Sequence, residues 1–207
     1  MLFLPKVTLV AFGSTNKVGM QKALEESCKG IVYGDVKLIT QVKCNSIDEW
    51  NKNIIYRLWE FIDTDYALLI HPDGYMIESD AWSDDFLDYD YVGSPWPLPQ
   101  DDFSYRDING KVQRVGNSVS LRSKRILELP TKMGYPWRSF HGNTNEDGYL
   151  CVNMRHALEK DGVRFAPVEV AARFGREHDV PENENVEQTF VFHKHYSPKN
   201  VKYKIYE

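Results

Sequence analysis

The sequence of 207 residues contains few cysteines, no long hydrophobic run and no excess of basic side chains. Its three cysteines, Cys28, Cys44 and Cys151, are widely separated, so they predict neither a disulfide framework nor a CxxC site. They favour a reducing compartment and hence a cytoplasmic location. No segment approaches the roughly 20 apolar residues that a membrane-spanning helix needs, so no membrane span is expected. Residues 1–12 (MLFLPKVTLVAF) lack a basic leader and are typical of a first strand rather than a signal peptide.

The charge balance also excludes one class of partner. Lysine and arginine total 25 against 30 aspartates and glutamates, which gives a formal charge of −5. A dedicated nucleic-acid binder usually carries a basic face, so no nucleic-acid partner is expected. Apolar residues make up 42% and charged residues 27%, close to globular averages. The length fits one domain with a sizeable core.

Strand and helix patterns alternate through the first half of the chain. Strands are predicted at residues 6–12, 31–33, 36–40 and 66–70, and helices at residues 18–28 and 46–62. The second helix has the clearest periodicity, with Ser46 and Glu49 at capping-box spacing. This order predicts an α/β fold, in which a mostly parallel central sheet is flanked by helices.

The second half is less regular. Residues 119–121 are typical of a short strand, residues 123–129 and 146–160 of helices, and residues 164–174 show a strand-like alternation. Residues 130–144 are expected to form a long irregular loop, which in a compact domain is more often functional than not.

Residues 71–74 (HPDG) directly follow the apolar run YALLI. Ligands of open α/β sheets bind beyond the carboxyl ends of the strands, and a carboxylate there can hold a hard cation that also contacts a diphosphate. The alternative is a plain turn, because P-D-G is ordinary turn chemistry.

Two further groups have alternative interpretations. Glu146 and Asp147 begin a predicted helix, where acidic residues either stabilise the helix start or supply a general base. His193 and His195 alternate near the end of the chain and are either metal ligands or ordinary surface histidines.

Several segments together resemble one known family. Residues 63–75 (DTDYALLIHPDGY) resemble its T-D/E-F/Y-x-L-x-x-Q-x-D-G/S stretch, and residues 82–96 (WSDDFLDYDYVGSPW) match its W-x-D/E-x-F-L-x-Y-D-Y-I/V-G-A/S-P-W pattern. The likeness continues in order through residues 115–123 (VGNSVSLRS), 146–147, 164–167, 171–174 and 192–193. The family was first catalogued as a domain of unknown function, is found in bacteria and large DNA viruses, and is similar to GT-A-type glycosyltransferases.

The resemblance implies a single GT-A-like domain, with a nucleotide-sugar-binding half at about residues 1–95 and an acceptor half at about residues 96–207. It implies transfer of a hexosyl or deoxyhexosyl group from a nucleotide sugar, with a UDP-sugar favoured, to a glycan or glycoprotein acceptor. Asp147 resembles the base of an inverting transferase with Glu146 beside it, and Asp73 and His193 resemble ligands of Mn²⁺ or Mg²⁺. The donor would contact Ala11, Phe12, Gly13, Ser14, Thr15, Arg57, His71, Asp73 and Gly74. The sugar and acceptor would contact Trp96, Gly116, Asn117 and Ser118.

The sequence departs from the family pattern at two places. His71 stands where the first carboxylate of the metal motif is expected, and VGNSVSLRS is one residue shorter than the family's VGNGGFSLRS. These departures motivate an alternative, a catalytically degenerate module that binds a nucleotide sugar without turnover. A metal-dependent phosphoester hydrolase is a third hypothesis, and it would need a denser cluster of ligands than the scattered histidines provide.

Overall fold

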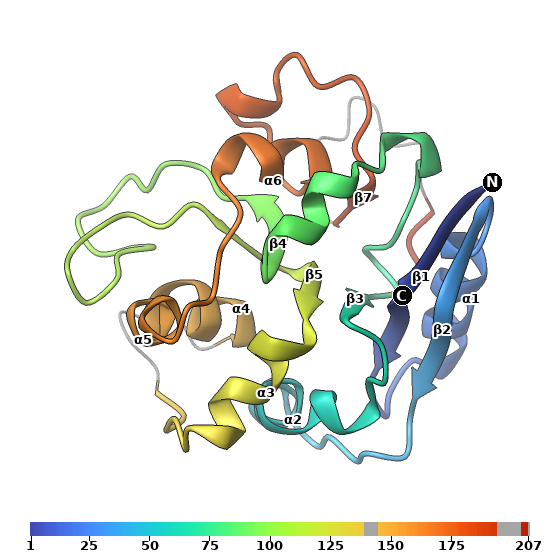
Figure 1. Ribbon diagram of the computed structural model, residues 1–207, viewed down its shortest axis with the longest axis horizontal. Helices are drawn as coiled ribbons and strands as arrows, with labels where there is room; N and C mark the ends of the chain where they lie inside the picture. Colours follow the sequence, from blue (N-terminus) through green and yellow to red (C-terminus); the bar gives the residue numbers. More distant parts are fainter. Residues whose placement is uncertain (139–144, 194–203, 207) are drawn as a thin grey trace.

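One five-stranded sheet forms the centre of the molecule (Figure 1). The computed structural model describes residues 1–138, 145–193 and 204–206. The strand order is β2-β1-β3-β5-β4. The strands are β1 (Leu2–Phe12), β2 (Ile31–Ile39), β3 (Tyr66–Ile70), β4 (Tyr91–Pro95) and β5 (Val115–Ser123). The prediction of an α/β domain whose sheet is flanked by helices is therefore confirmed.

The prediction of a mostly parallel sheet is wrong, because the sheet is mixed. Strand β1 pairs in parallel with β2 and β3, whereas β5 pairs antiparallel with both β3 and β4. The expected short strand at residues 119–121 is the middle of the longer β5. Asn117, Ser118, Ser120 and Arg122 interrupt its apolar character and hide its true length in the sequence.

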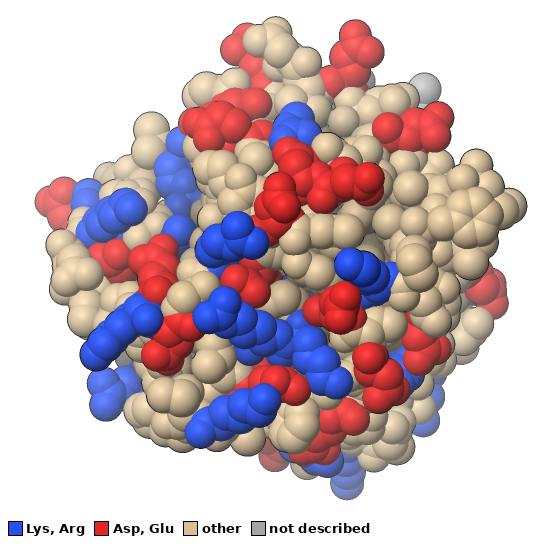
Figure 2. Space-filling view, in the orientation of Figure 1, with Lys and Arg blue, Asp and Glu red and all other residues tan. Residues whose placement is uncertain are grey.

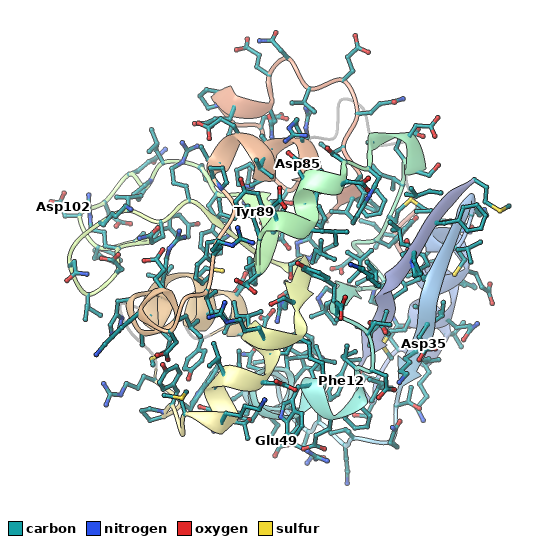
Figure 3. The ribbon with its side chains drawn as sticks, viewed as in Figure 1. Phe12, Asp35, Glu49, Asp85, Tyr89 and Asp102 are labelled. Carbon is teal, nitrogen blue, oxygen red and sulfur yellow. The ribbon has the colours of Figure 1, made fainter. Side chains whose placement is uncertain are left out.

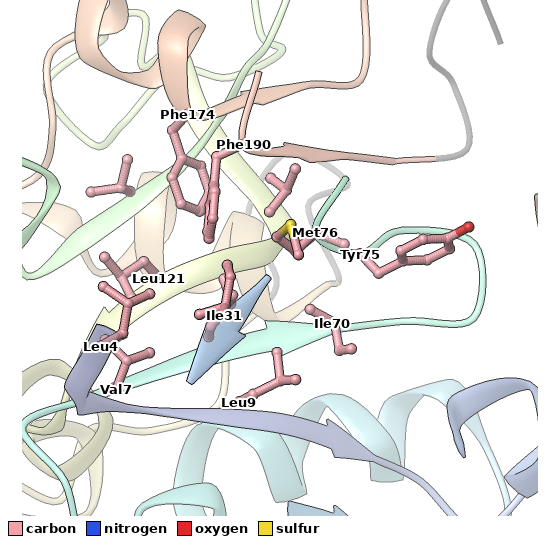
Figure 4. Close-up of a cluster of buried hydrophobic side chains, with 14 of the residues drawn as sticks. Leu4, Val7, Leu9, Ile31, Ile70, Tyr75, Met76, Leu121, Phe174 and Phe190 are labelled. Atoms are coloured by element: carbon pink, nitrogen blue, oxygen red, sulfur yellow. The ribbon is translucent and has the colours of Figure 1, made fainter. Parts of the chain in front are cut away.

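Apolar side chains of the central strands pack on both faces of the sheet. In β1, Leu9 and Ala11 belong to the cluster that includes α1 (Lys17–Ser27), drawn in Figure 4. Val10 points the other way, toward α2 (Ile47–Arg57) and α3 (Lys124–Lys132). Phe12, labelled in Figure 3, packs in that second cluster as well. Burial on both faces explains why these strands appear in the sequence as continuous apolar runs.

Side-chain caps fix where the first two helices begin. Asn16 adopts a left-handed backbone conformation, with φ of 44°, and its Oδ1 accepts a hydrogen bond of 3.0 Å from Gly19 N. Ser46 Oγ likewise accepts from Glu49 N at 3.1 Å, as the capping-box spacing predicts. Both caps lie close to the carboxyl-end edge of the sheet, where β1 enters α1 and the loop after β2 enters α2.

The remaining elements are short. Helix α6 (Val168–Phe174) occupies most of the segment in which a strand-like alternation was expected. The helix predicted at residues 146–160 is divided into α4 (Glu146–Gly148), a π-helical turn η4 (Tyr149–Asn153) and α5 (Arg155–Lys160). A second, two-stranded parallel sheet joins β6 (Gly175–Arg176) to β7 (Val191–Phe192). The 3-10 helices are η1 (Leu58–Phe61), η2 (Ser79–Ala81), η3 (Asp84–Asp88) and η5 (Pro181–Asn183).

Acidic and basic side chains are interspersed over the face displayed in Figure 2. The loop between β4 and β5 extends away from the sheet and carries Asp102, labelled in Figure 3. Within residues 1–138, 145–193 and 204–206, no helix has both the length and the apolar character needed to cross a bilayer.

Candidate functional site

A cavity of about 720 Å³ opens at the edge of the sheet where β1 and β3 end. Ala11 pairs with Ile70, so the segments that follow these two strands emerge side by side. Strand β5 runs the opposite way and pairs Ser120 with Leu69, which brings the earlier residues of β5 to the same edge. The walls come from residues 12–16, 44–47, 50–51, 71–73, 117–118 and 145–147, together with Glu177, His193 and Met20.

The turn after β3 places Asp73 at the cavity wall. His71 N donates to Gly74 O at 2.7 Å, and Gly74 N donates to His71 O at 3.2 Å. A side chain at position 74 would lie 2.6 Å from Val119 Cγ2 and 2.7 Å from His193 Cδ2, which explains the glycine. Residues 71–74 therefore form the tight turn that the P-D-G sequence predicts. The turn brings the Asp73 carboxylate toward His193 rather than into solvent.

Asp73 and His193 form a carboxylate–imidazole pair at the cavity wall. His193 Nε2 lies 3.7 Å from Asp73 Oδ1, and His193 Nδ1 lies 3.0 Å from Glu177 Oε1. Both residues are only partly exposed, with side-chain accessibilities of 14% for His193 and 16% for Asp73. The histidine ring thus lies between two carboxylates that come from distant parts of the chain.

The pair offers one carboxylate oxygen and one imidazole nitrogen, a small donor set for a divalent cation. Among the residues that the structure describes, no group of three or more histidines, cysteines, aspartates and glutamates could by itself hold a metal ion. Mg²⁺ and similar ions usually take one or two protein ligands and complete their shell with phosphate oxygens and water. Asp73 and His193 could hold an ion in that way, whereas His195 lies outside the described residues.

His71 is a partly buried, neutral imidazole beside this pair. Burial, reinforced by the neighbouring His193, lowers the pKa of His71 to about 4, so the ring is uncharged near neutral pH. Its ring centre lies 5.3 Å from that of Trp50 and 6.0 Å from that of His193. Its Nε2 has no hydrogen-bond partner among the described residues. A neutral imidazole therefore stands where the first carboxylate of the metal motif was expected.

Glu146, which also lines the cavity, belongs to a buried ion pair. Arg122 Nη2 lies 2.7 Å from Glu146 Oε1, and the two side chains are 0% and 1% exposed. Ser118 Oγ donates to the same carboxylate oxygen at 2.7 Å, and Glu146 N donates to Asn51 Oδ1 at 3.3 Å. The charge of Glu146 is thereby balanced, and the residue is held between β5 and α2.

Asp147 has the opposite environment, although it is the next residue. Its Oδ1 accepts a hydrogen bond of 2.7 Å from Gly148 N. Burial, followed by the charge of Glu146, raises the pKa of Asp147 to about 7. A carboxylate with that pKa, at the wall of a cavity, can take up a proton near neutral pH, as a general base does.

A family model described as "Protein of unknown function (DUF5672)" matches residues 36–193, well over half of the chain. The chain belongs to the DUF5672 family. No curated protein matches the sequence. The part matched by the DUF5672 model contains His71, Asp73, Glu146, Asp147 and His193, whereas the turn after β1 precedes it.

Most of the site residues expected from the sequence meet at this cavity in the DUF5672 chain. Those that line it are Phe12, Gly13, Ser14, Thr15, His71, Asp73, Asn117, Ser118, Glu146, Asp147 and His193. Those that do not line it are Ala11, Arg57, Gly74, Trp96 and Gly116. Ala11 lies within β1, where it pairs with Ile70, and Gly74 closes the turn by its two backbone hydrogen bonds to His71.

Arg57 and Trp96 lie elsewhere for identifiable reasons. Arg57 ends α2 and its Nη2 lies 3.4 Å from Glu60 Oε2, away from the cavity. Trp96 is buried and stacks on Tyr105, with ring centres 4.8 Å apart. Its ring covers Gly116, where a Cβ atom would lie 2.0 Å from two Trp96 ring carbons. Trp96 and Gly116 thus form a packing pair, and the cationic side chain beside Glu146 is Arg122.

Trp50 and Glu177 are among the wall residues that were not predicted from the sequence. Trp50 is one of the apolar residues of the helix predicted at residues 46–62, but it lines the cavity and its Nε1 donates to Phe12 O at 2.8 Å. Glu177 follows β6, and no sequence signal links it to His193 because the link depends on the pairing of β6 with β7. The position of Trp50, one helical turn after the Ser46 cap, is the one sequence feature that could have indicated its place at the cavity wall.

Proposed function

We propose that this protein is a metal-dependent glycosyltransferase with a GT-A-like fold. It would move a hexosyl or deoxyhexosyl group from a nucleotide sugar, with a UDP-sugar favoured, to a glycan or glycoprotein acceptor. The observation that carries the proposal is the meeting of the Asp73–His193 pair and Asp147 at one cavity. Three unpaired cysteines favour a cytoplasmic setting for this reaction.

The donor would occupy the side of the cavity formed by residues 12–16 and the turn after β3. This placement follows the rule that ligands of open α/β sheets bind beyond the carboxyl ends of the strands. Asp73 and His193 would hold Mn²⁺ or Mg²⁺ together with the diphosphate. When bound, the cation stabilises the negative charge that develops on the leaving diphosphate.

The acceptor would approach from the wall that carries Asp147. The ionised carboxylate of Asp147 takes the proton of an acceptor hydroxyl, and the freed oxygen attacks the anomeric carbon of the sugar. The bond from that carbon to the diphosphate breaks, and its electron pair leaves with the nucleotide. A single displacement of this kind inverts the anomeric configuration. Glu146, whose charge is balanced by Arg122, would not take the proton. It would instead keep the start of α4, and thus Asp147, in place.

Calorimetric titration with UDP tests the donor half of the proposal. We expect binding in the presence of Mn²⁺, and a loss of at least about tenfold in affinity, or ~1.4 kcal/mol, in D73A. D80A is the matched control because Asp80 is exposed and lies outside the cavity walls. Equal binding by D73A and the parent protein would contradict the assignment of Asp73, and no binding of any nucleoside diphosphate would contradict the donor class.

The alternative, a degenerate module that binds a nucleotide sugar without turnover, has one specific observation in its favour. His71 stands in place of an expected carboxylate and is neutral near pH 7, which reduces the negative charge available for a cation. UDP binding with no transfer and no donor hydrolysis across an acceptor panel would favour this alternative.

A further inference from the structure

Glu177 and His193 are brought together by the small second sheet. Arg176 of β6 pairs with Phe192 of β7, and His193 N donates to Arg176 O at 3.0 Å. The next side chains along the two strands, Glu177 and His193, therefore lie side by side. Glu177 Oε1 is 3.0 Å from His193 Nδ1, and Glu177 is only 8% exposed. This contact is thus set by paired backbones and does not depend on two freely rotating side chains.

Asn117 holds the other oxygen of the same carboxylate. Asn117 Nδ2 donates to Glu177 Oε2 at 2.9 Å, and Asn117 Oδ1 accepts from Val119 N at 2.9 Å. Its backbone is left-handed, with φ of 80°, a conformation that asparagine tolerates better than most residues. Tyr91 OH donates to Asn117 O at 2.6 Å and fixes the backbone as well. Because Asn117 is fully buried, the amide group that faces Glu177 has a defined direction.

This chain of contacts determines which nitrogen of His193 carries the proton. A carboxylate can only accept, so Glu177 Oε1 requires a hydrogen on His193 Nδ1. In a neutral imidazole, Nε2 then has a lone pair, and it is this atom that lies 3.7 Å from Asp73 Oδ1. The separation is longer than a hydrogen bond.

We propose that Glu177 is a positioning residue that holds His193 as the Nδ1–H tautomer and directs Nε2, together with Asp73, at a divalent cation. The role of the cation rests on the proposed function, whereas the tautomer does not. Carboxylate–histidine contacts of this kind orient metal-binding imidazoles in other proteins and raise their basicity.

The isosteric variant E177Q gives a sharp test. The Asn117 amide must still donate, so the glutamine oxygen would turn toward Asn117 and its NH₂ group toward His193 Nδ1. Nδ1 would then have to accept, and His193 would change to the Nε2–H tautomer. In the double variant N117D/E177Q the carboxylate accepts from the glutamine NH₂, the glutamine oxygen faces His193, and the Nδ1–H tautomer returns. E187Q, which changes an exposed glutamate of the same region, is the control.

The tautomer can be read from two-bond ¹⁵N–¹H NMR spectra of the metal-free, histidine-labelled protein at about pH 8, above the ordinary histidine pKa of about 6.5. H193Q identifies the signals of His193. We expect Nδ1–H in the parent protein, E187Q and N117D/E177Q, and Nε2–H in E177Q. An Nε2–H parent protein, or an E177Q variant with the parent tautomer, would overturn the proposal. If E177Q does not fold, the tautomer of His193 in the parent protein still tests the proposal.

Mn²⁺ binding, measured from the EPR signal of the free ion with UDP present, adds a second readout. E177Q should weaken binding by about 10–100-fold, and N117D/E177Q should recover part of the loss. If the parent protein binds no Mn²⁺ but shows the predicted tautomers, the proposed function fails and the positioning role of Glu177 stands. If Mn²⁺ binds equally well to the parent protein and E177Q, the positioning role fails alone.

Discussion

Two adjacent carboxylates, Glu146 and Asp147, are given different properties by their neighbours. Arg122 and Ser118 contact Glu146, which keeps its charge balanced inside the protein. Asp147 has no such cation in hydrogen-bond contact among the described residues. Its burial, followed by the charge of Glu146, raises its pKa to about 7. Pairs of titratable groups whose environments separate their pKa values are typical of acid–base sites.

The raised pKa of Asp147 gives a pH prediction. A base must be ionised to take a proton, so the transfer rate should fall about tenfold per pH unit below pH 7 and level off above it. Removing the base in D147N should lower the rate by about 10²–10⁴-fold at pH 8. Initial rates measured over about pH 5.5–9 check both statements. A pH-independent rate over this range would contradict the assignment of Asp147 as base.

The same shift predicts how stability varies with pH. A carboxyl group whose pKa is raised on folding contributes stability below its unfolded pKa of about 3.9, and this contribution is lost as pH rises through about 7. The parent protein should therefore lose stability relative to D147N between about pH 5 and pH 8. Thermal unfolding of both proteins measures the difference, with D80N as the control at an exposed aspartate. A difference that stays constant with pH would show that Asp147 titrates normally.

The Arg122–Glu146 pair should be far more important for stability than pairs at the surface. Removing one partner in E146A leaves Arg122 charged and fully buried, which costs about 3–5 kcal/mol. E128A breaks the exposed pair of Glu128 with Lys132 in α3 and should cost about 1 kcal/mol or less. Urea unfolding of the two variants compares these costs. If E146A and E128A lost similar amounts of unfolding free energy, the buried pair would be no more important for stability than the surface pair.

At the scale of elements, the strand β3 and the helix α2 were predicted correctly because their apolar patterns are strong. The full length and direction of β5 could not be predicted, since its polar residues serve the cavity and the Arg122–Glu146 pair. The strand-like alternation at residues 164–174 proved to be mainly helix α6, in which Ala171, Ala172 and Phe174 are fully buried. Sequence periodicity is therefore least reliable where tertiary contacts, rather than one apolar face, decide the local structure.

The contact of β5 with Trp96 predicts a strong effect of a small substitution. A methyl group in G116A would overlap the Trp96 ring at 2.0 Å, so we expect a loss of about 1–3 kcal/mol in the free energy of unfolding. Trp96→Leu removes that ring, and the double variant G116A/W96L should be less destabilised than the two single costs together imply. Urea unfolding of the three variants measures the coupling. Additive costs would contradict direct packing of Trp96 on Gly116.

At the scale of the whole molecule, the cavity collects residues from across the chain, from the turn at Gly13 to His193. Asp73, Asp147 and His193 are candidates on the sequence alone, but their proximity follows from the strand order and register. Glu177 and Arg122 could not be placed from the sequence, because their partners lie 16 and 24 residues away across tertiary contacts. The candidate ligands were therefore predictable, whereas the residues that orient them were not.

Release of nucleoside diphosphate from a panel of nucleotide sugars, with Mn²⁺ and mixed glycan acceptors, is the most direct test of the proposed glycosyl transfer. We expect release from at least one donor, dependent on Mn²⁺ and on an acceptor, lost in D73A and D147N and retained in D80A. Release that is unchanged in D73A and D147N, or no release from any donor, would contradict glycosyl transfer at this cavity.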